Sequence, residues 1–305
     1  MIMVSVTNND VISKCLVDAR LSATPLPDFP GQVPETLKQA YAIQAASIAR
    51  WPDKLAGWKV AGMSAVDRQR FSATRLAGPV FRSSVRRIES GSRATMPVYE
   101  GGFAAIEAEV VLELGCDVPH VERDFTDEEL ADLISAAYCG AEIASSPMAV
   151  VNQRGATSVI ADLGNNKGVI VGPEIPGWRA KAPNLLSVEV TVDDQVVGSA
   201  TLESIASAPL QALRFLVNHC ARHDIMLPAG ILVSSGLIAG QSLMAVLLAF
   251  VVLYEQAKLG MEETEHLLPH IASSFWGGLL VYPLLIGLLV WLPLSRMRRA
   301  SGGTE

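Results

Sequence analysis

The feature that most restricts the fold of this chain is a pair of long charge-free runs in its last third. Residues 225–254 and 271–295 contain no Asp, Glu, Lys or Arg. A helix that crosses the hydrocarbon core of a bilayer needs roughly 20 apolar residues, and soluble helices rarely avoid charge for so long. The sequence therefore predicts two membrane-spanning helices, over about 237–255 and 273–295, after a soluble part of different composition.

The charges around these runs predict how the hairpin is oriented. Arg296, Arg298 and Arg299 directly follow the second run, whereas the connecting segment is acidic and includes Glu262 and Glu263. Basic residues near membrane helices stay on the cytoplasmic side, so both ends are expected there, with the loop outside. The alternative is a pair of apolar soluble helices that pack against the rest of the chain.

The remainder of the sequence reads as a soluble cytoplasmic domain. The net charge is −7 and no cluster of Lys and Arg occurs, which excludes a nucleic-acid interface as the main function. The first 20 residues carry charges and lack the apolar core of a secretory signal. No C-x-x-C motif occurs, so a reducing compartment is favoured over a disulfide framework or a zinc site; the four cysteines are Cys15, Cys116, Cys139 and Cys220.

Hydrophobic periodicity predicts mixed helices and strands between residues 35 and 236. A helix is expected over 35–50, and Thr126 is expected to cap a second helix that runs to about Ala137. A third helix is predicted over 209–222. Strands are predicted over 55–62, 104–115 and 227–236, together with a hairpin over 187–199 and loop with short strands over 79–95.

The strand over 104–115 carries the candidate metal ligands. Its alternation places Glu107, Glu109 and Glu113 on one face. Carboxylates at positions i and i+2 of a strand are about 6–7 Å apart at the Cα atoms, so both can reach one hard cation. Glu142, which lies in an otherwise apolar segment, is the candidate third ligand. The alternative is that these glutamates mark the solvated face of an amphipathic strand.

Further polar residues are candidates for a substrate cleft. Lys59, in a short strand bounded by glycines, could neutralise a substrate carboxylate or move a proton, or it could be an ordinary exposed lysine. Asp162 and Asn165, in the segment that continues to Lys167, and Ser235 are the other candidates. His219 and His223 share a helix face but lack a third ligand, so they are predicted to be surface residues.

In combination, several motifs resemble the fumarylacetoacetate hydrolase superfamily, and most closely its 2-oxopent-4-enoate hydratase and 2-oxo-hexenedioate decarboxylase branch. The resemblance covers about residues 10–236. Its motifs, in chain order, are AYAIQ, GWKVAG, GPVF, AAIEAEVVLELG, AEIASSP, IADLGNNKGVIVGP, PLQALRFLVNHCARHD and LPAGILVSSG.

The resemblance implies a function for the candidate residues. Glu107, Glu109 and Glu142 correspond to the ligands of a divalent ion, Mg²⁺ or Mn²⁺, and Lys59 corresponds to the family lysine. The expected activity is hydration or decarboxylation of a small unsaturated 2-oxo or 2-hydroxydienoic acid from aromatic catabolism, through a metal-chelated enolate. The expected partners are this small acid, the membrane through the C-terminal hairpin and, as an open possibility, further copies of the chain.

The sequence departs from the family after Gly236, where the expected closing strands are replaced by the apolar runs. The last 70 or so residues resemble the end of an oligopeptide-transporter-type membrane protein, which suggests a gene fusion. We therefore expect an incomplete α+β fold, a mixed β-roll or sandwich with flanking helices (1–80 and 81–236), tethered to the cytoplasmic membrane by a hairpin (237–305). The rival hypotheses are a non-catalytic fusion product with a truncated domain and a membrane-anchored binding module.

Overall fold

The computed structural model describes residues 8–179, 187–192, 195–201 and 208–236. All of them belong to one compact unit, Met1–Ala239. The helical elements are α1 (Asn8–Ser22), α2 (Leu37–Arg50), α3 (Ala65–Phe71), η1 (Arg82–Ser84), α4 (Asp127–Asp132), α5 (Ala156–Ala161), η2 (Leu163–Asn165) and α6 (Ala208–Arg222). The strands are β1 (Leu55–Gly62), β2 (Arg75–Phe81), β3 (Val85–Arg87), β4 (Phe103–Leu114), β5 (Ile134–Ser146), β6 (Asn166–Glu174), β7 (Ser187–Val192), β8 (Gln195–Thr201) and β9 (Leu232–Gly236).

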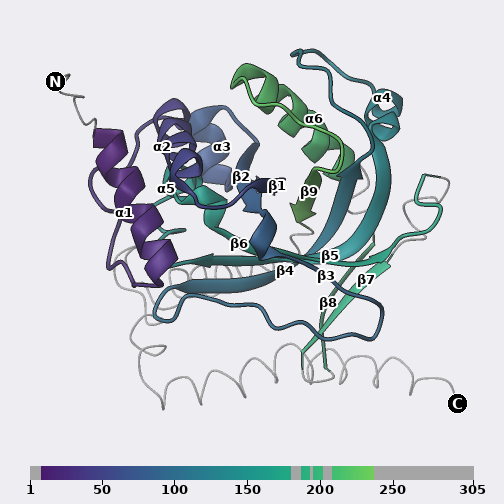
Figure 1. Cartoon of the computed structure of the whole chain (residues 1–305), viewed down its shortest axis with the longest axis horizontal. Helices are drawn as coiled ribbons and strands as arrows, with labels where there is room; N and C mark the ends of the chain where they lie inside the picture. Colours follow the sequence, from purple (N-terminus) through teal and green to yellow (C-terminus); the bar gives the residue numbers. More distant parts are fainter. Residues whose placement is uncertain (1–7, 180–186, 193–194, 202–207, 237–305) are drawn as a thin grey trace, which may run out of the picture. The chain divides into compact units, whose positions relative to one another are not determined.

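Seven strands form one mixed sheet in the order β2-β1-β9-β4-β5-β6-β3. The pairs β1–β9 and β3–β6 are parallel and the others are antiparallel. The edge strands β2 and β3 are separated in the chain only by η1, which has 3 residues. This short link requires the sheet to curl, and Figure 1 shows the curl in the long strands β4 and β5.

Both faces of the central strands are covered. Val110 and Leu112 of β4 belong to a core that includes Leu213 and Leu216 of α6. On the opposite face, Val111 packs with valines of neighbouring strands in a smaller cluster. The acidic positions of β4 therefore lie beside buried apolar side chains of the sheet, and these side chains set the environment of the candidate site.

One of the predicted elements is corrected by the structure. The helix that Thr126 caps ends at Asp132, and Ile134 begins β5 instead of continuing the helix to Ala137. Ile134 pairs with Leu114 of β4, so strand pairing overrides the local helical periodicity. The segment 79–95 agrees with its prediction as loop with short strands, because it holds the end of β2, η1, the short strand β3 and irregular chain.

The other predicted elements of the soluble part are present. They include the helices over 35–50 and 209–222, the strands β1, β4 and β9, and the β7–β8 hairpin. The turn of that hairpin and the two predicted membrane helices lie outside the described residues. Within the described part of the chain, no helix is both long enough and apolar enough to span a bilayer.

Candidate metal centre

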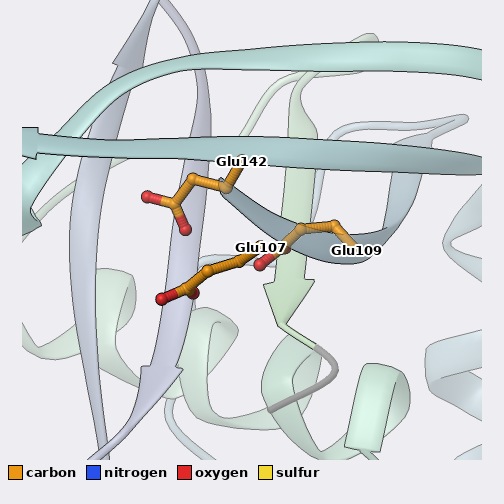
Figure 2. A group of neighbouring side chains, drawn as sticks. All are labelled: Glu107, Glu109 and Glu142. Carbon is orange, nitrogen blue, oxygen red and sulfur yellow. The ribbon is translucent and has the colours of Figure 1, made fainter. Parts of the chain in front are cut away.

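Three glutamates of two adjacent strands bring their carboxylates together. Glu107 of β4 lies directly opposite Glu142 of β5, and Glu109 lies two positions along β4 on the same face. One ligand oxygen from each residue can be chosen so that all three lie within 4.8 Å of one another. Figure 2 shows the three side chains turned toward a common region.

Burial excludes a solvated strand face as the environment of two of these glutamates. Glu109 is 2% exposed and Glu142 is 1% exposed, because the curled sheet and the neighbouring strands cover them. Glu113, two positions beyond Val111, is only partly buried and forms a 2.8 Å ion pair with Arg87. The alternative interpretation of β4 is therefore wrong for Glu109, and Glu113 lies outside the cluster.

Lys59 and Ser234 complete the polar surroundings from two further strands. Lys59 Nζ lies 3.1 Å from Glu142 Oε1, and the residue is 4% exposed, so it is not an ordinary surface lysine. The Ser234 hydroxyl donates a hydrogen bond of 2.6 Å to Glu109 Oε2. This arrangement is possible because β9 lies between β1 and β4 and pairs Ser234 with Lys59.

The three carboxylates of the cluster carry more negative charge than the single Lys59 ammonium can balance. Burial, followed by repulsion from Glu142, raises the pKa of Glu109 well above its usual value. Burial also raises the pKa of Glu142, although Lys59 opposes the shift. Burial lowers the pKa of Lys59, but attraction to Glu142 and Glu107 outweighs it and leaves this pKa raised.

The donor set fits a divalent cation. All three candidate ligands are carboxylates, which Mg²⁺, Mn²⁺ and Ca²⁺ prefer over nitrogen or sulfur donors. One ammonium faces three carboxylates, and a bound dication would remove the imbalance of charge. Glu107, Glu109 and Glu142 could therefore hold a divalent metal ion, as the sequence predicted.

Asn166 at the start of β6 orients one of these ligands. Its side-chain amide donates to Glu142 Oε1 at 2.9 Å. The preceding residues Leu163, Gly164 and Asn165 all have positive φ angles, of 54°, 68° and 61°. Left-handed conformations are unfavourable for residues other than glycine, and such strain is concentrated at functional sites. This tight segment places Asn166 beside the carboxylate cluster.

Arg20 of α1 binds the same segment, residues 162–166, through hydrogen bonds. Its guanidinium donates to both carboxylate oxygens of Asp162, at 2.6 and 2.8 Å, and to the carbonyl oxygen of Asn166 at 2.8 Å. Both charged side chains are almost fully buried. Asp162, predicted to face the substrate cleft, is thus engaged by Arg20.

Asn165 and Ser235 are placed differently from Glu107, Glu109, Glu142 and Lys59. Both are buried, and the Asn165 Oδ1 and Ser235 Oγ atoms have no hydrogen-bond partner among the residues that the structure describes. Ser235 pairs with Val110 of β4, whereas its neighbour Ser234 bonds Glu109. A role of either residue in substrate binding stays a prediction.

His219 corrects another expectation, because it is buried rather than at the surface. It is 3% exposed, and its ring lies against Tyr41 and His223, with centroids 4.4 Å away in both cases. Burial, with smaller contributions from His223 and Arg222, lowers its pKa to about 3. Both histidine rings lie against Tyr41 of α2, so the shared helix face reflects packing and not metal binding.

Sequence reasoning did not assign roles to Arg20 and Ser234. From the sequence, Asn166 and Lys167 are placed with Asp162 and Asn165 in a turn that could line a cleft, without an individual role. Arg20 is one of two cations on a helix of mixed polarity, and its partner Asp162 lies 142 residues away in the chain. The GNN run of residues 164–166, which leads into β6, is the sequence signal for Asn166, because such runs favour unusual backbone angles.

Comparison with solved structures identifies a known fold that this chain shares. No family model matches the chain, and no curated protein matches its sequence. The structure is similar to that of 4-oxalocrotonate decarboxylase from Pseudomonas putida G7 complexed with calcium and acetate, with a TM-score of 0.61 and 16% identity over 77% of this chain and 92% of that chain. The same enzyme complexed with magnesium and adipate gives a TM-score of 0.60 and 18% identity over 76% and 88%. The described unit therefore has the α+β fold of this decarboxylase, in agreement with the architecture that the sequence resemblance implied.

Proposed function

We propose that the chain is a divalent-metal-dependent enzyme that acts on a small 2-oxo acid, as a hydratase or a decarboxylase. The observation that carries the proposal is the meeting of Glu107, Glu109 and Glu142 within 4.8 Å, with the Lys59 ammonium 3.1 Å from Glu142. Support comes from the similar decarboxylase, whose structures hold calcium or magnesium together with a carboxylic acid. The preferred substrates are unsaturated 2-oxo or 2-hydroxydienoic acids of aromatic catabolism.

In this proposal each residue of the site has a distinct role. Glu107, Glu109 and Glu142 would hold Mg²⁺ or Mn²⁺, which supplies a Lewis acid for the keto and carboxylate oxygens of the substrate. Lys59 keeps a positive charge beside this position and can hold a substrate carboxylate or stabilise negative charge that develops during the reaction. Ser234 and Asn166 fix the orientation of Glu109 and Glu142, so that the ligands need little rearrangement.

Turnover with and without metal tests this function. We expect the purified full chain to consume a 2-hydroxydienoate in the presence of Mg²⁺ or Mn²⁺, and to lose this activity on treatment with EDTA and regain it when metal is returned. A folded protein that binds no divalent ion, or turnover that EDTA does not affect, would contradict the proposal. Folded protein with no turnover of any such acid would favour the non-catalytic fusion product.

We further propose that residues 237–295 tether this enzyme to the cytoplasmic membrane as a helical hairpin. The support is the sequence alone: two charge-free runs, an acidic connecting segment and three arginines after the second run. The enzyme-like part would then face the cytoplasm.

A further inference from the structure

The turn that leads into β6, residues 162–166, touches the backbone of β2 at two facing glycines. A Cβ atom at Gly78 would lie 2.6 Å from Gly164 Cα and 2.7 Å from the Leu163 carbonyl oxygen. A Cβ atom at Gly164 would likewise lie 2.6 Å from Gly78 Cα. Side chains do not approach backbone atoms so closely, so the turn can lie at this depth only while both positions are glycine.

Gly78 places this contact on the face of the sheet that carries the metal centre. It pairs directly with Lys59 of β1, and Lys59 pairs in turn with Ser234 of β9. Residues directly opposite each other on antiparallel strands project from the same face, so a side chain at Gly78 would stand beside Lys59. The turn takes up that space, next to the lysine whose Nζ lies 3.1 Å from Glu142 Oε1.

Arg20 of α1 holds both ends of the same turn. Its guanidinium donates to the carboxylate and the carbonyl oxygen of Asp162 and, at 2.8 Å, to the carbonyl oxygen of Asn166. The three residues between these ends all have positive φ angles. Strained backbone of this kind persists only where its surroundings enforce it. Arg20 and the contact with β2 are the surroundings that enforce it here.

The position of the turn controls the orientation of one candidate metal ligand. Asn166 stands at the end of the turn, and its amide donates at 2.9 Å to Glu142 Oε1, the oxygen that Lys59 also approaches. Hydrogen bonds weaken steeply when their distance and angle depart from the optimum. A displacement of the turn away from β2 would therefore weaken the hold of Asn166 on Glu142.

Resting on the proposed metal-dependent function, we infer that Gly78 is a positioning residue of the metal centre. Its lack of a side chain lets the turn settle on β2, and the settled turn presents Asn166 to Glu142. Gly78 has no polar side-chain atom with which to bind metal or substrate, so it acts through Asn166. Arg20 supports the same turn from α1.

The test adds one methyl group at the contact. Gly78→Ala must push the turn away from β2, and we expect calorimetric titration of the full chain to show Mg²⁺ affinity reduced by about tenfold, as is typical for groups that orient a ligand. Gly172→Ala of β6 is the matched control, because its Cβ atom would lie 2.7 Å from the Cys139 carbonyl oxygen. This comparable clash elsewhere on the sheet should lower resistance to urea and leave Mg²⁺ affinity unchanged.

A double variant shows whether Gly78 acts through Asn166. Asn166→Ala already removes the amide, so adding Gly78→Ala to it should lower Mg²⁺ affinity no further. A general disturbance of the fold would instead cause the same additional loss in both backgrounds.

If Gly78→Ala does not fold, Arg20→Lys tests the same turn. Lysine keeps a positive charge beside Asp162 but lacks the planar fork that also binds the Asn166 carbonyl. Mg²⁺ affinity should then fall in Arg20→Lys, and it should fall no further when Arg20→Lys is added to Asn166→Ala. Wild-type affinity in Arg20→Lys, or a full further loss in this double variant, would contradict the inference.

The outcomes separate this inference from the proposed function. If the wild-type chain binds Mg²⁺ and Gly78→Ala binds it equally well, the positioning role is wrong and the metal-dependent function stands. An equal loss in Gly172→Ala, or a full further loss in the double variant with Asn166→Ala, also overturns the role of Gly78. If the folded wild-type chain binds no Mg²⁺, the proposed function and the inference both fall.

Discussion

At the scale of single residues, the central feature is the buried Glu109 carboxylate, whose negative charge destabilises the folded protein when no metal ion is bound. Burial and Glu142 raise the pKa of Glu109 in the folded state. A carboxyl group whose pKa is higher in the folded than in the unfolded protein lowers stability as pH rises above the unfolded value of about 4.3. At neutral pH the metal-free protein therefore bears an electrostatic cost that a bound cation would remove.

Replacing this carboxylate should weaken metal binding without weakening the fold. Glu109→Gln is expected to reduce Mg²⁺ affinity by at least about tenfold, since even outer-shell changes have effects of that size. The metal-free variant should be at least as resistant to urea at pH 7 as the wild-type chain. Glu113→Gln, on the same strand but outside the cluster, is the control and should leave Mg²⁺ affinity unchanged. Equal losses in both variants, measured by calorimetry, would contradict the assignment.

Asn166 should affect metal binding through Glu142. Asn166→Ala removes the 2.9 Å hydrogen bond to Glu142 Oε1, and we expect Mg²⁺ affinity to fall by about 10–100-fold, as is typical for groups that orient a ligand. Asn152→Ala, an exposed change, serves as the control. Unaltered Mg²⁺ affinity in Asn166→Ala would show that Glu142 needs no orienting partner.

At the scale of elements, the Arg20–Asp162 pair ties α1 to the segment before β6. Arg20→Met leaves the Asp162 carboxylate buried without its partner, which should reduce the free energy of unfolding by about 3–5 kcal/mol. In the double variant with Asp162→Asn, the loss should be clearly smaller than the sum of the two single losses. Urea denaturation measures all three. Simple additivity would show that the pair does not act as a unit.

The helix α6 should make stability sensitive to acid through His219. Its pKa is about 3 in the folded protein, compared with about 6.5 when unfolded. Because the folded pKa is the lower one, stability is complete above pH 6.5 and is lost as pH falls toward 3, by about 2 kcal/mol at pH 5. His219→Gln, which cannot be protonated there, should lose correspondingly less stability between pH 7.5 and pH 5. Identical losses in the two proteins would refute the role of His219.

The elements also show how far the sequence can be interpreted. The alternation of β4 predicted both the strand and the face shared by Glu107 and Glu109, because period two is unambiguous over so long a run. It could not show that this face is buried, since the residues that pack on Val111 of β4 come from strands far away in the chain. For the same reason Ile134 and Ala137 were predicted as helix, whereas pairing with β4 makes both of them part of a strand.

At the scale of the whole molecule, the proposed attachment to a membrane makes a prediction of its own. If residues 237–295 form the predicted hairpin, the full chain should stay in the membrane fraction after carbonate extraction. The 256–270 loop should then be cleaved by protease only from the non-cytoplasmic side. Release into the soluble fraction, or cleavage only from the cytoplasmic side, would rule out this topology.

The central claim is that three glutamates of two strands hold one divalent ion. Anomalous diffraction from crystals grown with Mn²⁺ tests it most directly. The account predicts a single strong peak within about 2.6 Å of a carboxylate oxygen of each of Glu107, Glu109 and Glu142, the range that hard cations take from oxygen ligands. A peak bound by other residues, or no peak beside these carboxylates at saturating Mn²⁺, would contradict it.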